Sequence, residues 1–360
     1  MAVTYDFEID SSHVPSDLTD FPVRLDLANL STAIREDLAA NIDASGNGFR
    51  VKDSGGTVLD YTLENFSNAG STVVGELVFR CSPTSASNLG LKLTADSALS
   101  NNENQSGVYS TYNAGWNFEQ DPSGTAPQLT DITGNGYDGT TTGSMTSGDK
   151  IPGILGSCWD FDGTDDDVPV GNWPSATTDT WSVLFWVWAD TSPSTGMMIF
   201  NNDAGGYDDS FQLGLTPETT SVNTNDRFAI NHQDTASSVR TIAEDDTNVV
   251  HSQWYQVACT SDGSNLKLYV DGVLKDTTAK VGTYLNVDSK SAVIGKRAGA
   301  TSRLWNGRMN EGFAKEAALS ADWIEFDHLN MTESDNCLVN WAVESSGGTV
   351  TPYYYYLANQ

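Results

Sequence analysis

The most constraining feature of this sequence is the run WSVLFWVWA at residues 181–189, which is apolar on both faces of an extended strand. Successive side chains of a strand point to opposite faces, so the run separates into two sets. One set is Trp181, Val183, Phe185 and Val187, and the other is Leu184, Trp186 and Trp188. A strand that is apolar on both faces must be covered on both, which predicts a central strand in a sandwich of two sheets.

Short apolar runs separated by Gly, Ser, Thr, Asn and Asp surround this strand, and this texture predicts an all-β protein. The dipeptide Asp271-Gly272, between LKLYV and VLKD, is typical of a tight type I′ hairpin. Two helices are expected, one after the capping residue Ser31 and one over residues 319–330. Further strands are expected at 211–215, 227–231, 239–242, 254–260, 266–270 and 292–295.

The chain divides at the polar stretch 97–107, which contains ALSNNENQSG and has no hydrophobic period. We expect a small β-rich domain with one short helix at 1–107 and a larger β-domain at 108–334. Residues 335–360 are expected to form a C-terminal tail with an interaction segment.

The net charge of −30, from 48 acidic and 18 basic residues, repels nucleic acid and anionic lipid and suits divalent cations. No window approaches the roughly 18 apolar residues of a membrane span, so no membrane insertion is expected. The first ten residues, MAVTYDFEID, lack the basic and apolar regions of a secretory signal.

Three stretches in order resemble the laminin-G-like family, a branch of the concanavalin A-like jelly rolls. They are GWNFEQ with DITGNGYDGT (115–140), GILGSCWDFDGTDDDVPV (153–170), and WYQVACTSDGSNLKLYVDGVL followed by VIGKR and NGRMNEGFAKEAALSADWI (254–324). The resemblance implies a concanavalin A-like jelly-roll β-sandwich from about residue 110 to 334. Residues 20–27, 48–66 and 75–80 resemble a small β-domain of uncharacterised function that often precedes such jelly rolls.

The same resemblance implies a structural calcium ion, because members of the family often bind calcium through loop carboxylates and carbonyls. The implied ligands are Asp131, Asn135, Asp162, Asp165 and Glu311. The alternative is that these residues form turns, since Asp and Asn side chains accept hydrogen bonds from nearby backbone amides.

Sugar binding requires exposed aromatic rings beside hydrogen-bonding groups. Trp173, Tyr207 and Trp305 lie in or near loop-like segments and are candidates, although tryptophans of a sandwich are mostly core residues.

Catalytic motifs are missing from the sequence, which favours a protein that is not an enzyme. The closest match to the E-x-D-x-x-E strand of related glycosidases begins at Glu325, ends in Asn330 and falls on the expected helix. No nucleophile elbow, HExxH, P-loop or Rossmann fingerprint is present, and the four histidines are scattered.

The four cysteines are Cys81, Cys158, Cys259 and Cys337, and their spacing disfavours a zinc site. Buried free thiols are the favoured interpretation, and a bridge between Cys158 and Cys259 stays open.

These features together favour a non-enzymatic structural or adhesion protein of a virion surface, such as a capsid decoration, head fibre or tail-associated protein. Its expected partners are other virion subunits or copies of itself, and cell-surface or polysaccharide glycans. The alternatives are a secreted microbial carbohydrate-binding protein, the accessory module of a glycan-degrading enzyme, or a weak hydrolase with an unrecognised site.

The tyrosines Tyr353, Tyr354, Tyr355 and Tyr356 follow a flexible Ser-Ser-Gly-Gly and are expected to dock on another subunit. Deleting residues 349–360 is therefore predicted to leave a folded monomer and to weaken assembly, as measured by light scattering. Normal assembly of the shortened chain, or its failure to fold, would contradict the docking role and favour a strand that folds back on its own domain.

Overall fold

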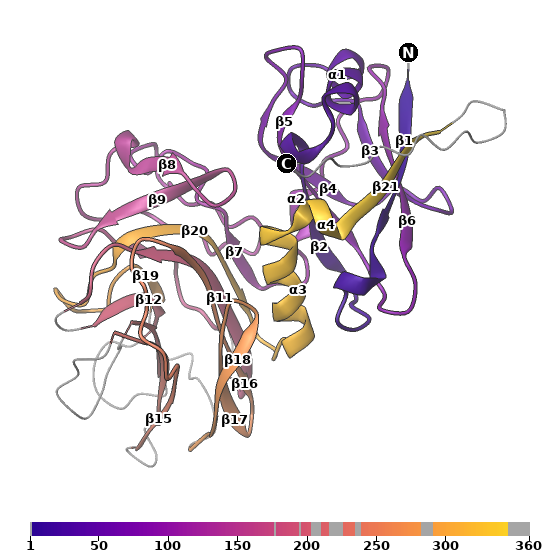
Figure 1. Ribbon diagram of the computed structural model, residues 1–360. Coiled ribbons are helices and arrows are strands. Elements are labelled where there is room, and N and C mark those ends of the chain that lie inside the picture. Colours follow the sequence, from indigo (N-terminus) through magenta and orange to yellow (C-terminus); the bar gives the residue numbers. More distant parts are fainter. Residues whose placement is uncertain are drawn as a thin grey trace. The chain divides into compact units, whose positions relative to one another are not determined.

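A computed structural model describes residues 2–175, 178–193, 196–202, 210–215, 226–234, 239–281 and 291–344 (Figure 1). The chain forms two compact units. One unit comprises residues 1–108 together with 329–360, and the other comprises residues 109–328. The described part contains no helix that is long and apolar enough to cross a membrane.

The first unit is built from two antiparallel sheets. One sheet has the order β21 (Leu338–Val343), β1 (Val3–Ile9), β6 (Leu89–Ala95) and β3 (Phe49–Asp53). The other has the order β2 (Phe21–Asp26), β5 (Val74–Cys81) and β4 (Tyr61–Ser67). Phe7 on β1 meets Phe79 on β5 edge to face, with ring centroids 5.9 Å apart, so the two sheets share an aromatic core.

Helix α1 (Thr32–Asn41) begins where the sequence predicts, because the Ser31 side chain accepts a hydrogen bond from the Ile34 amide. Leu38 is its fully buried residue. The remaining short helices of this unit are η1 (Ser11–His13), η2 (Leu27–Asn29), α2 (Gln105–Val108) and α4 (Ser334–Cys337).

The sequence-based division was wrong about residues 329–344, which it split between the jelly roll and the tail. Strand β21 pairs with β1, and Trp341 stacks on Phe7 with ring centroids 4.4 Å apart. The Asn330 side chain bonds both backbone groups of Arg24, at 2.7 and 3.1 Å. Strand β1 needs a second hydrogen-bonded neighbour and Phe7 needs cover, and this returning segment supplies both.

The second unit is a sandwich of an eight-stranded and a six-stranded sheet, as the jelly-roll prediction requires. The larger sheet contains β7 (Ala114–Trp116), β8 (Lys150–Pro152), β9 (Ser157–Asp162), β11 (Thr180–Ala189), β16 (Trp254–Asp262), β17 (Asn265–Val270), β18 (Val273–Ala279) and β20 (Asn306–Lys315). The smaller contains β10 (Val168–Pro169), β12 (Met197–Asn201), β13 (Ser210–Leu215), β14 (Phe228–Asp234), β15 (Val239–Glu244) and β19 (Val293–Ile294). The 3₁₀ helix η3 (Ser147–Asp149) precedes β8.

Strand β11 is central, as its two apolar faces predict, and lies between β16 and β20. Val183 and Phe185 are fully buried in the core between the sheets. On the opposite face, Trp186 is 1% exposed and stacks on His328 of helix α3 (Ala321–Thr332), with ring centroids 5.4 Å apart. The helix therefore supplies the second cover that the strand needs.

The predicted hairpin at Asp271-Gly272 is confirmed. Both residues have positive φ, 51° and 75°, as a type I′ turn demands, and they join β17 to β18. Helix α3 also begins as predicted, because the Ser320 hydroxyl accepts a hydrogen bond from the Trp323 amide at 3.0 Å.

All four cysteines are buried and free, so the open question of a Cys158–Cys259 bridge is answered in favour of thiols. Burial raises the pKa of the Cys158 thiol to about 12, which leaves it protonated and unreactive near neutral pH.

A buried cluster of charged residues in the first unit contains two acids and one arginine. Glu64 and Glu76 lie directly opposite each other on β4 and β5, and the Arg24 Nη1 atom lies 3.5 and 3.1 Å from their carboxylates. One guanidinium thus serves two buried acids. Burial, reinforced by the charge of Glu64 and opposed by Arg24, raises the pKa of Glu76 to about 7.

The raised pKa predicts a pH-dependent stability. The unfolded chain loses the Glu76 proton near pH 4.5, whereas the folded chain holds it until about pH 7, so the stability contribution falls as pH rises between these values. Glu76→Gln cannot lose that proton. We expect its thermal midpoint to fall less than that of the wild type between pH 5 and 7, and to match or exceed it at pH 8.

The exposed Glu36 of α1 provides the matched control, and Glu36→Gln should follow the wild-type pH profile. Parallel curves for Glu76→Gln and the wild type would mean that Glu76 is ionised throughout this range.

Candidate functional site

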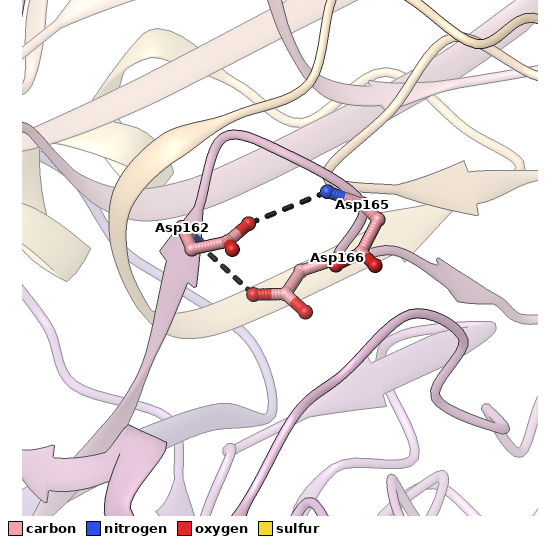
Figure 2. Close-up of side chains that lie close together, drawn as sticks. All are labelled: Asp162, Asp165 and Asp166. Atoms are coloured by element: carbon pink, nitrogen blue, oxygen red, sulfur yellow. Dashed lines mark hydrogen bonds between the residues drawn. The ribbon is translucent and has the colours of Figure 1, made fainter.

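Three aspartates converge in the loop that follows β9. Oxygens of Asp162, Asp165 and Asp166 lie within 4.8 Å of one another (Figure 2). Asp162 and Asp165 are exposed, whereas Asp166 is only 3% exposed. We call these three residues the acidic cluster.

Backbone hydrogen bonds hold the acidic cluster in place. The Asp162 Oδ1 atom accepts hydrogen bonds from the amides of Thr164 at 2.7 Å and Asp165 at 3.3 Å. The Asp162 amide in turn donates to Oδ2 of Asp166 at 3.0 Å (Figure 2). Gly163 has a φ of 72°, and a Cβ there would lie 2.7 Å from that of Asn306, so only glycine suits this turn. The loop therefore turns three like charges toward one another.

The second oxygen of Asp166, Oδ1, is buried and has no hydrogen-bond partner among the residues that the structure describes. Burial first, and then the charges of Asp162 and Asp165, raise the pKa of Asp166 to about 6, against the hydrogen bond from the Asp162 amide. A bound cation would satisfy this oxygen and offset the repulsion among the three carboxylates.

The donor set fits calcium, which takes six to eight oxygen ligands from carboxylates, carbonyls and water. Asp162, Asp165 and Asp166 would hold the ion, and its chemistry there would be structural, the fixing of the loop between β9 and β10.

Two of the five residues predicted to bind calcium, Asp162 and Asp165, belong to the acidic cluster. Neither Asp131 nor Glu311 is part of this group of converging carboxylates. Asp131 accepts hydrogen bonds from the amides of Gly115, Thr133 and Tyr137, at 3.0 to 3.1 Å.

The other two residues also lie in local contacts. The Asn135 side chain donates to the carbonyl of Asn113 at 3.0 Å. Glu311 is 4% exposed and lies opposite Trp186 on β20. Asp131 and Asn135 thus act as turn-formers in this structure.

Sequence reasoning missed Asp166 as a member of the acidic cluster. The motif FDGTDDD offers four aspartates, and position alone does not show which are buried or where their oxygens point. The nearest signal in the sequence is that Phe161 and Val168 are both apolar strand residues. Their positions set the length of the loop that carries the aspartates.

The prediction of Trp173 and Trp305 as sugar platforms was wrong. Trp173 is 1% exposed and packs between Phe200 and Phe211, with ring centroids 5.8 Å from each. Trp305 is fully buried. A ring inside the core presents no face to a sugar. Tyr207, and Tyr353 to Tyr356, lie outside the described residues.

The glycosidase-like motif lies on helix α3, as predicted, and not on a strand. The carboxylate of Asp327 accepts a hydrogen bond at 2.8 Å from Nε2 of Gln256 on β16. That carboxylate is therefore used to fasten the helix to the sheet.

The second unit is thus an antiparallel two-sheet sandwich with an acidic loop after β9. Residues 162–325, which lie within this second unit, match the family model of the concanavalin A-like lectin/glucanases superfamily. No curated protein matches the chain in sequence.

Several solved structures resemble the chain in fold. Domain 4 of AbnA, an extracellular GH43 arabinanase from Geobacillus stearothermophilus solved with arabinotriose, is 18% identical, with a TM-score of 0.47, over 61% of this chain and 98% of that one. The CBM40 of Ruminococcus gnavus IT-sialidase, bound to α2,3 sialyllactose, is 14% identical, with a TM-score of 0.34, over 41% and 81%. The binding domain of botulinum neurotoxin serotype D is 14% identical, with a TM-score of 0.44, over 61% and 50%. None of these similarities assigns a ligand to this chain.

If the acidic cluster binds calcium, the ion should stabilise the folded chain by mass action. Saturating calcium is predicted to raise the thermal midpoint of chelator-treated protein by several degrees, about 5 to 10 °C at a hundredfold excess over Kd. Asp166→Asn should lose most of this response.

Asp121→Asn is the control, because Asp121 also caps a turn of this unit and is exposed. Equal midpoints in chelator and calcium, with no metal in elemental analysis, would show that the aspartates are ordinary turn residues.

Proposed function

We propose that this chain is a non-enzymatic, glycan-binding surface protein, carried on a virus particle as a capsid decoration, head fibre or tail-associated protein. Its jelly roll binds carbohydrate, and a calcium ion in the acidic cluster has a structural role. Other subunits of the particle, or copies of the chain itself, are its protein partners.

The observation that carries the non-enzymatic part is the position of the Glu325–Asp327 motif. Related hydrolases need carboxylates that point together from one strand into a cleft. Here the two acids lie on α3, and Asp327 is bonded to Gln256. A carboxylate that is committed to holding a helix on the sheet is not free to act as acid or base.

The glycan-binding part is supported by the class of the second unit, a superfamily that joins lectins and glucanases. Without the hydrolytic arrangement, a domain of this class retains binding as its function. The strong negative charge supports an exposed, soluble surface protein and disfavours nucleic acid as a ligand.

Where the protein is found distinguishes a virion surface protein from a secreted carbohydrate-binding protein. Antibodies against the chain are expected to label purified virus particles in electron micrographs. Labelling confined to secreted protein or to a glycan-degrading complex would contradict the virion setting and leave glycan binding in place.

Purified protein is predicted to bind polysaccharide without cleaving it. Affinity electrophoresis against a panel of soluble polysaccharides should show retardation, and a reducing-end assay should show no release above a protein-free blank. A known glucanase serves as the positive control for release. Retardation by no polysaccharide would overturn the glycan-binding function, and release of reducing ends would overturn the non-enzymatic one.

A further inference from the structure

Four side chains form a straight row across the larger sheet of the second unit. Trp254 on β16 pairs with Trp188 on β11, Trp188 pairs with Arg308 on β20, and Arg308 pairs with Asp160 on β9. These four strands are consecutive neighbours in the sheet (Figure 1). Paired residues of adjacent strands point to the same face, so all four side chains share one face.

That face is the outer one. The chain neighbours of the row belong to the core between the sheets, namely Val187, Ala189, Tyr255, Met309, Trp159 and Phe161. Because side chains alternate along a strand, the row points away from that core. Each of its four members is half-buried, neither covered nor fully exposed.

Helix α3 covers the same face only up to the preceding row. Trp186 stacks on His328, and Gln256 bonds Asp327. Two residues further along β11, Trp188 keeps part of its surface in solvent. The row therefore lies on the same face as the part that α3 covers, just beyond the helix, and is only partly buried.

The polar members of the row are uncommitted. Arg308 lies over the Trp188 ring, with Cζ 4.8 Å from the ring centroid, and makes no ion pair or hydrogen bond within the described part of the chain. The carboxylate of Asp160 accepts no hydrogen bond there; burial and then the charge of Asp190 raise its pKa, and the nearby charge of Arg308 opposes that rise. In a chain with 48 acidic and 18 basic residues, an unpaired arginine is unexpected.

The aromatic members are fixed in place. The Trp188 Nε1 donates to Asp190 Oδ1 at 2.9 Å, and the Trp188 and Trp254 rings meet edge to face with centroids 5.9 Å apart. Rigid rings and a stacked guanidinium lose little conformational entropy when a ligand binds.

This chemistry fits a neutral sugar. An aromatic ring packs against the C–H face of a sugar ring, while a planar guanidinium and a carboxylate donate to and accept from neighbouring hydroxyls. One arginine between Asp160 and Asp190 leaves the surroundings of the row net negative, which disfavours uronic and sialic acids.

We infer that Trp254, Trp188, Arg308 and Asp160 form the binding site for a neutral oligosaccharide. The inference rests on the proposed glycan-binding function and gives it a location and a ligand class. Three strand spacings make the row about 14 Å long, the length of a short oligosaccharide.

The test measures the affinity of the full chain for soluble neutral polysaccharides (mannan, arabinan and dextran) and acidic ones (polygalacturonate and polysialic acid). Trp254→Ala and Arg308→Gln should each weaken binding to the preferred neutral polysaccharide by about tenfold or more. Trp254→Phe, which keeps an aromatic face, should stay within a few-fold of the wild type.

Lys315→Gln is the matched control, because Lys315 also lies on β20 over a tryptophan, with Nζ 5.7 Å from the Trp323 ring centroid. It should bind as the wild type does. Unchanged thermal midpoints show that the variants are folded.

Each outcome decides the matter. Wild-type affinity in Trp254→Ala and Arg308→Gln would overturn this location while the glycan-binding function stands. Binding of acidic polysaccharides alone would overturn the neutral ligand class. Binding of no polysaccharide by the wild type would overturn both. A wild-type dimer that Trp254→Ala dissociates in light scattering, with sugar binding unchanged, would make the row a self-interface.

Discussion

The second unit depends on the burial of β11 on both faces. Each face is closed in a different way, one by the opposing six-stranded sheet and the other by helix α3. Burying aromatic side chains of this size contributes a large share of the stability of a domain. The helix is consequently part of the hydrophobic structure, and Trp188, near one end of β11, stays partly open.

Several acids of this chain have local structural roles. Asp131 organises the loop before Gly139, Asp327 fastens a helix, and Glu64 and Glu76 share Arg24 inside the first unit. Two places contain charged groups without such a role. Within the described residues, the acidic cluster gathers carboxylates around a buried oxygen that has no hydrogen-bond partner, and the Arg308 side chain forms no ion pair or hydrogen bond beside Asp160. A bound ligand can supply the partner that these charged groups lack.

Local patterns predicted much of the fold. The two-sided strand at 181–189, the Asp271-Gly272 turn and the two capped helices follow from neighbouring residues, and the structure confirms them. Pairings between distant segments were beyond such reasoning: β21 was assigned to a tail because its partner β1 lies more than 300 residues away. The exposure of individual tryptophans was beyond such reasoning as well: Trp173, in a loop-like segment, is buried, whereas Trp188, in the apolar strand, is partly exposed. A family motif predicted Asp162 and Asp165 as calcium ligands, and this stays a prediction, whereas the place of Asp166 beside them is visible only in the folded loop.

The pairing of β1 with β21 also determines how the chain responds to pulling. Tyr5 lies opposite Val343 and Ile9 opposite Leu338, so residues 3 and 343 sit at the same end of one antiparallel ladder. Tension applied between residues 3 and 343 therefore breaks the hydrogen bonds of this ladder one after another. Residues 109–328 lie between the two strands in the sequence. They bear no tension until the hydrogen bonds between β1 and β21 have opened. A domain that is inserted in this way keeps its shape while the pairing of β1 with β21 bears the tension.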